Sequence, residues 1–558
     1  MATFSPKCPL CKQYVERLLH DFKTPGEQAV VQKLQKRFPS WSIYQGMCER
    51  CLYLNEFDAF DEHFLPDPDL PDGESGTGAS AVRSTLFRER VQNEFALLPT
   101  YLRLNADPRF RGKGVTIAFI DSGFYPHPDL IKPKNRIKKI VDVTDEKRER
   151  RYFDDPHPES WHGMMTSVAA AGNGHLSAGM YRGIASDANV VLIKVMNMKT
   201  RHINTEDITR GLRWAIQNAE KYNIRIISLS VADDEPASLT DSPVDQAVED
   251  AVKKGIVVVT AVGNNPSKPV IPPASSPSAI TVGGLDDRNE IWKEWRQMFH
   301  STYGKTVDGY TKPELIAPAI WVAGPILPGT DQFKESPVLF KLINSTQRIA
   351  EKLFERHRKD LPSAPKTLVK GDYKSWARTR IQEMQYIAPY YKHVDGTSFA
   401  APIVSSVIAQ MFEANPDLTP EEIKHILMET AEPLTGVTDE QQGCGVLVPR
   451  AALERALEMR YRELTPGVHA IDGRLLFVYH NRVPRTVAVA GSFNNWDQKS
   501  VRLEESDGGW WSGWLPKPAP GQYQYKYIID GAVWLEDPAN KSKEPDGVGG
   551  WNSFLIVN

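Results

Sequence analysis

The stretch Gly396-Thr397-Ser398-Phe399-Ala400-Ala401-Pro402 is the most informative part of the sequence. It puts Ser398 in a tight Gly-Thr turn, directly ahead of small residues that are typical of a buried helix. A helix N-terminus favours developing negative charge, so a serine there is well placed to act as a nucleophile. A serine before a helix is more often a simple cap, and the choice depends on residues elsewhere that supply a base and an orienting acid.

A first partner for Ser398 is Asp121, at the end of an apolar run. Residues 114–120 read Gly-Val-Thr-Ile-Ala-Phe-Ile, the pattern expected of a strand buried in a parallel sheet, and Asp121-Ser122-Gly123 follow. Open α/β sheets have their sites at the carboxyl ends of such strands. The sequence therefore predicts an acid at the functional edge of the sheet.

The second partner is His162, which begins the small, apolar stretch of residues 162–171. This pattern predicts a histidine at the head of a buried helix. A serine nucleophile needs a base to take its proton, and the base needs a carboxylate to fix its tautomer and offset its charge. Other histidines flank motifs without the same helix-and-glycine context: His127, His157, His175 and His393.

In these residues the chain resembles the subtilisin-like serine proteases. The serine motif is similar to the family's Gly-Thr-Ser-Met-Ala-x-Pro, with Phe399 in place of Met. The family usually has Thr after its His-Gly, where this chain has Met164. The order Asp, His, Ser is that of subtilisin. The resemblance implies an α/β domain with a central parallel sheet over residues 95–462 that hydrolyses peptide bonds through Asp121, His162 and Ser398.

The resemblance also assigns an oxyanion hole and a substrate strand. Gly255–Asn264 reads as a strand running into a Gly-Asn turn, and the family carries its oxyanion asparagine at the position of Asn264. The Asn264 amide and the Ser398 N–H would donate to the oxyanion. The family strand that pairs with substrate usually reads Ser-Leu-Gly, and the replacement of that glycine by Ser230 is expected to narrow the first specificity pocket. The implied substrate-binding residues are Ser228, Leu229, Ser230 and Gly263.

Composition predicts an ordinary soluble enzyme with several domains. The chain has 558 residues, 41% hydrophobic and 25% charged, which is close to globular averages. The net charge of −3 does not indicate nucleic-acid binding, and no run of 18 apolar residues suggests a membrane span. The N-terminus lacks an apolar signal core, so the chain is expected to be cytoplasmic, unlike many secreted members of the family.

Four of the five cysteines lie in the first 51 residues, within a predicted module of residues 1–57. They form two Cys-x-x-Cys pairs, Cys8 with Cys11 and Cys48 with Cys51. In a reducing compartment such pairs predict a structural, tetrahedral Zn²⁺ site, with disulfides or free thiols as the alternative. An acidic linker rich in Pro and Gly follows over residues 58–94. No catalytic cofactor is expected, and no residues are assigned to the calcium that family members use for stability.

About 60 extra residues, roughly 330–390, lie ahead of Ser398 where the family has a short segment. Apolar spacing predicts one helix over Val338–Lys359 and another over Tyr373–Met384. An insertion at this point must leave the body near the active-site mouth. We expect a lid, an exosite or a partner-binding arm, with a surface elaboration as the alternative.

Residues 466–558 alternate short apolar runs with turns, which predicts an antiparallel β-sandwich. The strings Val487–Trp496, Tyr523–Tyr527 and Asp530–Trp534 resemble the glycogen-binding module of the AMP-activated kinase β subunit and of starch-branching enzymes. Flat aromatic faces suit the C–H faces of α-glucan rings, while Lys and Asn bond the hydroxyls. The resemblance implies sugar contacts by Trp496, Lys526, Trp534 and Asn552, with protein docking as the alternative.

Together these patterns predict a multi-domain intracellular serine endopeptidase that its flanking modules regulate or target. Two alternatives stay open. One is a catalytically silent scaffold with the protease fold, and the other is an α-glucan-associated binding protein whose hydrolase acts on esters. The expected partners are a protein or peptide substrate, and an α-glucan or a partner protein at the C-terminal sandwich.

Overall fold

The computed structural model describes residues 8–10, 18–20, 22, 28, 30–32, 34–35, 41–48, 51–52, 97–145, 150–291, 293–365, 372–462, 465–471, 474–506 and 509–557. The chain divides into two compact units, Met1–Ala456 and Leu457–Asn558. Among the described residues, no helix is long and apolar enough to cross a membrane.

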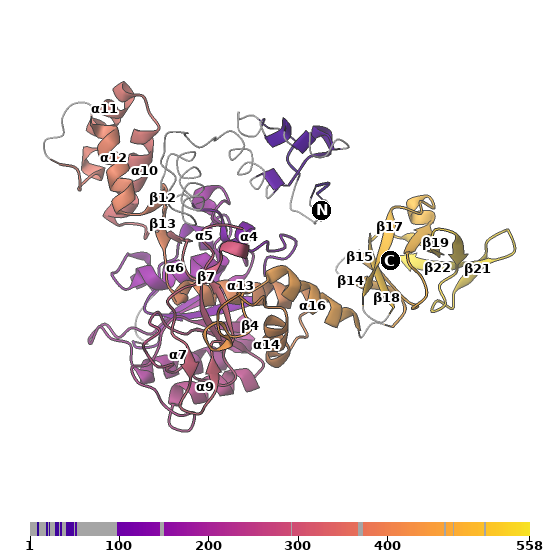
Figure 1. The fold of residues 1–558 in the computed structure, drawn as a ribbon, viewed down its shortest axis with the longest axis horizontal. Helices are drawn as coiled ribbons and strands as arrows, with labels where there is room; N and C mark the ends of the chain where they lie inside the picture. The colour runs from indigo at the N-terminus through magenta and orange to yellow at the C-terminus, as the bar shows by residue number, and fades with distance from the viewer. Residues whose placement is uncertain are drawn as a thin grey trace. The chain divides into compact units, whose positions relative to one another are not determined.

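The centre of the first unit is an eight-stranded sheet in the order β10-β6-β5-β4-β1-β3-β2, with the short β7 paired to β6 (Figure 1). All pairs are parallel except β6 with β7. The α/β fold with a central parallel sheet is therefore confirmed. The strands are β1 Thr116–Asp121, β2 Ile137–Asp142, β3 Asn189–Lys194, β4 Ile224–Leu229, β5 Val257–Ala261, β6 Ile280–Asp286, β7 Gln297–Met298 and β10 Leu315–Pro318.

Helices cover both faces of this sheet (Figure 1). Helices α7 (Thr205–Gln217) and α9 (Pro243–Lys253) share one apolar core with alternate residues of β1, β3, β4 and β5. Helix α13 (Thr397–Ala414) packs on β4, β5, β6 and β10 together with α6 (Ser160–Ala171). Both α6 and α13 consist mainly of small and apolar residues, which allows a helix to be buried on nearly all sides.

Shorter elements complete the first unit. They are η1 Ile43–Gln45, α4 Thr100–Arg103, α5 Pro128–Ile131, η2 Arg150–Asp154, η3 His175–Ser177, α8 Ala219–Tyr222, η4 Lys293–Trp295, β8 Gly304–Lys305, β9 Thr311–Lys312, α14 Pro420–Glu429, α15 Asp439–Gln442 and α16 Pro449–Arg462, the last of which runs into the second unit.

The extra residues ahead of Ser398 form a three-helix subdomain with its own apolar core. Its elements are α10 Asp331–Ile343, α11 Gln347–Arg356, η5 Arg358–Asp360 and α12 Tyr373–Glu383, on a small sheet of β11 Val322–Pro325, β12 Tyr386–Ala388 and β13 Tyr391–Val394. The predicted single helix over Val338–Lys359 is wrong. The chain turns at Asn344–Thr346, and Thr346 starts α11 as its N-cap, because these polar residues favour ends and turns over helix interiors.

The second unit is an antiparallel nine-stranded sheet in the order β14-β15-β18-β17-β16-β19-β22-β21, with β20 paired to β19. Although β15 and β19 are far apart in this order, the ring centroids of Tyr479 and Tyr527 lie 4.8 Å apart, so the sheet folds over itself around one core. The elements are β14 Gly467–Ile471, β15 Arg474–His480, β16 Val487–Gly491, η6 Ser492–Asn494, β17 Val501–Ser506, β18 Trp510–Pro516, β19 Gly521–Ile529, β20 Val533–Leu535, β21 Lys543–Pro545 and β22 Trp551–Val557.

Candidate active site

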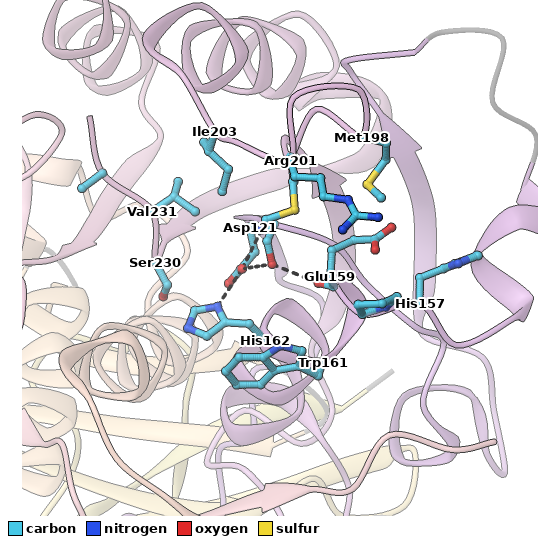
Figure 2. Close-up of a pocket in the computed structure, with 14 residues that line it drawn as sticks. Asp121, His157, Glu159, Trp161, His162, Met198, Arg201, Ile203, Ser230 and Val231 are labelled. Atoms are coloured by element: carbon cyan, nitrogen blue, oxygen red, sulfur yellow. Dashed lines mark hydrogen bonds and ion pairs between the residues drawn. The ribbon is translucent and has the colours of Figure 1, made fainter. Parts of the chain in front are cut away.

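Asp121 and His162 meet where β1 ends beside helix α6. The His162 Nδ1 lies 2.7 Å from Asp121 Oδ1, and the carboxylate is almost fully buried (Figure 2). Burial lowers the pKa of His162, but the charge and hydrogen bond of Asp121 outweigh this effect, so the pKa is raised above its ordinary value of 6.5. The pair has the geometry of a base with its orienting acid.

Three further donors point at the Asp121 carboxylate. The Ser122 N–H and hydroxyl lie 2.6 and 3.2 Å from Oδ1, and the Thr166 hydroxyl lies 3.1 Å from Oδ2. Thr166 stands one helical turn after His162, so α6 carries both the base and a donor to its partner. These hydrogen bonds satisfy the oxygens of a buried carboxylate, which would otherwise be costly to remove from water.

Ser398 is the second residue of helix α13, which follows Gly396 as N-cap, and the Gly396 φ of 125° favours glycine. Its neighbour Phe399 has its ring 6.2 Å from the His162 ring, so the helix start and the base are adjacent. Within the part of the chain that the structure describes, no hydrogen bond joins the Ser398 hydroxyl to His162. Such bonds are often long without substrate and tighten in the complex. The triad assignment therefore stays a prediction that this geometry supports.

Asn264 is held by the residue ahead of the nucleophile. Its Oδ1 accepts the N–H and the hydroxyl of Thr397 at 2.8 and 2.9 Å. With the carbonyl side so occupied, the Nδ2 side of the amide is oriented as the donor, as an oxyanion hole requires. The turn itself is clamped by Thr302, whose hydroxyl donates to Asn265 O at 2.8 Å and whose N–H donates to Gly263 O at 3.0 Å.

The predicted substrate strand runs into a cavity of about 580 Å³ beside His162 (Figure 2). Ser228 and Leu229 are buried at the end of β4, next to β1, while Gly263 has a φ of 109° in the Asn264 turn. Ser230 does line the cavity, but its hydroxyl is engaged with the backbone carbonyl of Ser398 at 2.9 Å. The cavity walls are Asp121, Ser122, His157, Pro158, Glu159, Trp161, His162, Met196, Met198, Arg201, Ile203, Ser230, Val231 and Ala232.

The competing histidines have other surroundings. His127 is fully buried and accepts the Asp129 N–H as the cap of α5, and burial lowers its pKa to about 4. His393 accepts the Trp321 N–H, and burial likewise lowers its pKa to about 4. His157 stacks on Tyr152 and lines the cavity, and His175 lies in η3. His162 alone among these candidates bonds Asp121.

Three of the four predicted zinc ligands lie together in the N-terminal module. The sulfurs of Cys8, Cys48 and Cys51 are within 4.8 Å of one another, and Cys11 falls outside the described residues. Tetrahedral Zn²⁺ with bonds of about 2.3 Å would separate its sulfurs by about 3.8 Å, and Cys8 Sγ lies 3.9 Å from Cys51 Sγ. The Cys48 and Cys51 N–H groups point at the Cys8 and Cys48 sulfurs. The residues therefore fit a zinc ion.

The predicted sugar-binding residues of the second unit fall into two pairs. Trp496 and Trp534 lie with ring centroids 6.1 Å apart, and Trp534 is 37% exposed. Asn495 and Trp496 both have positive φ, at 53° and 58°, which is an uncommon backbone conformation for a side chain as bulky as tryptophan. Lys526 and Asn552 are turned to internal partners instead: Lys526 pairs with Asp546 at 2.6 Å, and Asn552 donates to Gln524 at 2.9 Å.

The sequence motifs assign no role to several groups that the structure places in the site. These are Ser122, Thr166, Thr302, Thr397 and the Ser230–Ser398 contact. Thr166 and Thr397 lie within the quoted motifs, and a polar hydroxyl in an otherwise apolar helix was a signal that it bonds something buried. Ser230 and Thr302 gave no such signal, because their partners are distant in sequence.

Comparison with known proteins finds two families that match the chain. Residues 467–541 match carbohydrate-binding module 48 (isoamylase N-terminal domain), and residues 112–445 match the subtilase family. The chain is similar to serine protease AprX of Bacillus subtilis, 31% identical over 324 residues, which are 57% of this chain and 61% of that protein.

Subtilisin-like protease 2 of Arthroderma otae is 34% identical over 30% of this chain and 36% of its own length. The chain thus spans about three fifths or less of these two relatives. A solved protease of Pseudoalteromonas arctica has 22% identity and a TM-score of 0.43, covering 64% of this chain and 93% of that one. With its family match running through the strand of Asp121, the helix of His162 and the helix of Ser398, this chain belongs to the subtilase family of serine proteases.

Proposed function

We propose that this chain is a serine endopeptidase in which Ser398 is the nucleophile, His162 the base and Asp121 the acid that orients it. The observation that carries the proposal is the 2.7 Å contact between His162 Nδ1 and the buried Asp121 carboxylate, beside the start of α13, in a subtilase chain. It favours the tautomer in which His162 Nε2 is free to accept a proton.

The residues suit acyl transfer in two steps. Ser398 Oγ attacks the peptide carbonyl while His162 Nε2 takes its proton, and the negative oxygen is stabilised by Asn264 Nδ2 and the Ser398 N–H. His162 then gives the proton to the departing amine, which leaves an acyl group on Ser398. Water, deprotonated by His162, releases the acid and restores the serine. Asp121 stays ionised throughout and offsets the charge of the imidazolium.

The proposal is tested by hydrolysis of an internally quenched peptide library and by labelling with a fluorophosphonate, whose fluoride Ser398 would displace. We expect the wild-type chain to cleave peptides and to be labelled, and Ser398→Ala to do neither. Ser405→Ala is the matched control, because Ser405 lies in the same helix and its hydroxyl donates to the Ala401 carbonyl of that helix. A folded wild-type chain that is neither labelled nor active would favour the silent scaffold, and turnover of esters alone would favour an esterase.

We also propose that the second unit binds an α-glucan and that the flanking modules direct or regulate the peptidase. The Trp496–Trp534 pair supports sugar binding, since two neighbouring rings tilted at 48° offer flat apolar faces, and residues 467–541 match a carbohydrate-binding module. Retardation of the chain in a native gel containing glycogen tests this. Unchanged mobility in glycogen and in starch would favour a protein-docking role.

For the N-terminal module, we propose a structural Zn²⁺ held by Cys8, Cys48 and Cys51, with Cys11 as the fourth ligand predicted from the sequence. The sulfur spacing supports it. Such a metal would contribute folding energy to a module that has a small apolar core. Metal analysis of the purified chain tests the proposal, with one equivalent of zinc expected.

A further inference from the structure

The carbonyl of Ser398 lacks its ordinary helical donor. In an α-helix the carbonyl of residue i accepts the N–H of residue i+4, and four residues after Ser398 stands Pro402, inside α13. Proline has no N–H, so the sequence removes that bond. The affected carbonyl belongs to the residue predicted to be the nucleophile, and Ser398 is half-buried in a helix whose other residues are mostly buried. A partly buried carbonyl without a partner is costly, so a donor from outside the helix would stabilise it.

Ser230 supplies this donor. Its hydroxyl lies 2.9 Å from the Ser398 carbonyl oxygen, across 168 residues of sequence. Ser230 stands one residue past the end of β4, so the bond joins the first turn of α13 to the strand edge that lines the cavity beside His162 (Figure 2). A glycine at this position, as in the resembling family motif, has no side chain with which to make the bond.

From this contact we infer that Ser230 is a positioning residue for the nucleophile. The inference rests on the proposed function of Ser398. The peptide groups on either side of the Ser398 Cα carry its N–H and its carbonyl. Fixing the carbonyl therefore limits rotation of the residue that presents both the attacking hydroxyl and one oxyanion donor. Ser230 acts through the backbone of Ser398, and its hydroxyl is committed to that carbonyl instead of to substrate in the cavity.

The test compares variants of Ser230 that distinguish loss of the hydroxyl donor from a change in side-chain volume. Ser230→Ala removes the donor, while Ser230→Thr and Ser230→Val form a pair of similar volume in which only threonine keeps the hydroxyl. Ser405→Ala, which removes a different hydroxyl-to-carbonyl bond within α13, is the matched control. The readouts are the rate of labelling by a small fluorophosphonate, and kcat and KM for peptides that differ in the side chain entering the cavity.

We expect Ser230→Ala and Ser230→Val to lower the labelling rate and kcat about 3- to 10-fold, by a similar factor for every peptide and with KM unchanged. Ser230→Thr should stay within about twofold of wild type, as should the Ser405→Ala control. A Ser230→Ala variant that is labelled at the wild-type rate would overturn the inference. Changes confined to KM that vary with the substrate side chain would also overturn it, because Ser230 would then act only as a wall of the cavity.

Failure of the proposed function is distinguishable from failure of this inference. A wild-type chain that is inert, like Ser398→Ala, refutes the peptidase proposal, whereas an active wild type with an equally active Ser230→Ala refutes only the role of Ser230. Hydrogen exchange decides the structural step without any activity. We expect the amides of the first turn of α13, including Phe399, to exchange faster in Ser230→Ala than in wild type or Ser405→Ala, and equal exchange would overturn it.

Discussion

The hydrogen bond from Thr166 to Asp121 gives a quantitative test of how the acid of the site is tuned. Thr166 is 1% exposed, and its hydroxyl lies 3.1 Å from both Asp121 Oδ2 and the Gly163 carbonyl. Thr166→Val keeps the branched shape and a similar volume and removes only the donor. The packing of α6 against β1 should therefore be retained, with the Asp121–His162 contact intact.

The expected shift of the pH midpoint follows from the strength of the Thr166 hydrogen bond, whose single proton has two acceptors. A hydrogen bond to a charged group contributes about 1.5–3 kcal/mol, and because Thr166 has two acceptors we take the lower bound, about 1.5 kcal/mol. An Asp121 carboxylate with fewer donors attracts the His162 N–H more strongly. If about half of the lost bond reappears in that attraction, the acid limb of kcat/KM moves to higher pH by about 0.5, since about 1.4 kcal/mol corresponds to one pH unit.

The wild-type enzyme should already lose activity at low pH. His162 works as a base only when neutral, and its pKa is raised by Asp121 against the opposing effect of burial, so activity should already fall below a midpoint above pH 6.5. Thr166→Val moves that midpoint further up, while kcat/KM on the high-pH plateau stays within about threefold.

The assay is kcat/KM for a quenched peptide from about pH 5 to pH 9 at constant ionic strength. Thr209→Val is the matched control, because Thr209 is a mostly buried threonine of α7 whose hydroxyl bonds only its own helix, at the Thr205 carbonyl. A midpoint that stays in place or moves to lower pH in Thr166→Val would refute the reasoning, and so would an equal movement in the control.

Three further outcomes are expected. Asn264→Ala should lower kcat about 10²–10³-fold with little change in KM, the loss measured for one oxyanion donor in subtilisin, and an unchanged kcat would exclude Asn264 from the oxyanion hole. Trp534→Ala should weaken retardation in glycogen gels about tenfold without altering hydrolysis of a short peptide, and equal retardation would exclude the Trp496–Trp534 pair as the sugar site. Cys48→Ser should reduce bound zinc well below one equivalent and destabilise the N-terminal module, and full zinc content would exclude Cys48 as a ligand.

The elements that carry the site were predictable because each has a recognisable pattern in a short stretch of sequence. The apolar run before Asp121, the small-residue helix after His162 and the Gly-Thr-Ser turn are short motifs, and their local patterns of burial determine strand or helix. The break between α10 and α11 was not predictable from periodicity, because the apolar spacing continues on both sides of Asn344–Thr346. Two helices joined by a turn can bury apolar faces of the same spacing as one long helix would.

The contacts that tune the site are harder to predict, because they depend on which distant segments meet. The consequence of Pro402 for the Ser398 carbonyl is visible in the sequence, but its solution by Ser230 is visible only in the fold. The same holds for Lys526, whose ammonium was expected beside a sugar and is engaged with Asp546. The Asp546 carboxylate also accepts the N–H groups of Val548 and Gly550 in its own turn. The Lys526 side chain and these backbone donors lower the pKa of Asp546. The ion pair is therefore part of the structure of that turn.

Three hydroxyls in the candidate site share one physical role: Thr166 donates to Asp121 Oδ2, Thr397 to Asn264 Oδ1 and Ser230 to the Ser398 carbonyl. Each satisfies an acceptor on a residue that the proposed mechanism uses directly. A cation in their place would stabilise the Asp121 carboxylate more strongly but would also oppose the positive charge that His162 must acquire. Neutral donors orient these groups without that opposition. In the proposed mechanism the site can therefore be rigid and still leave His162 basic enough to take the proton of Ser398.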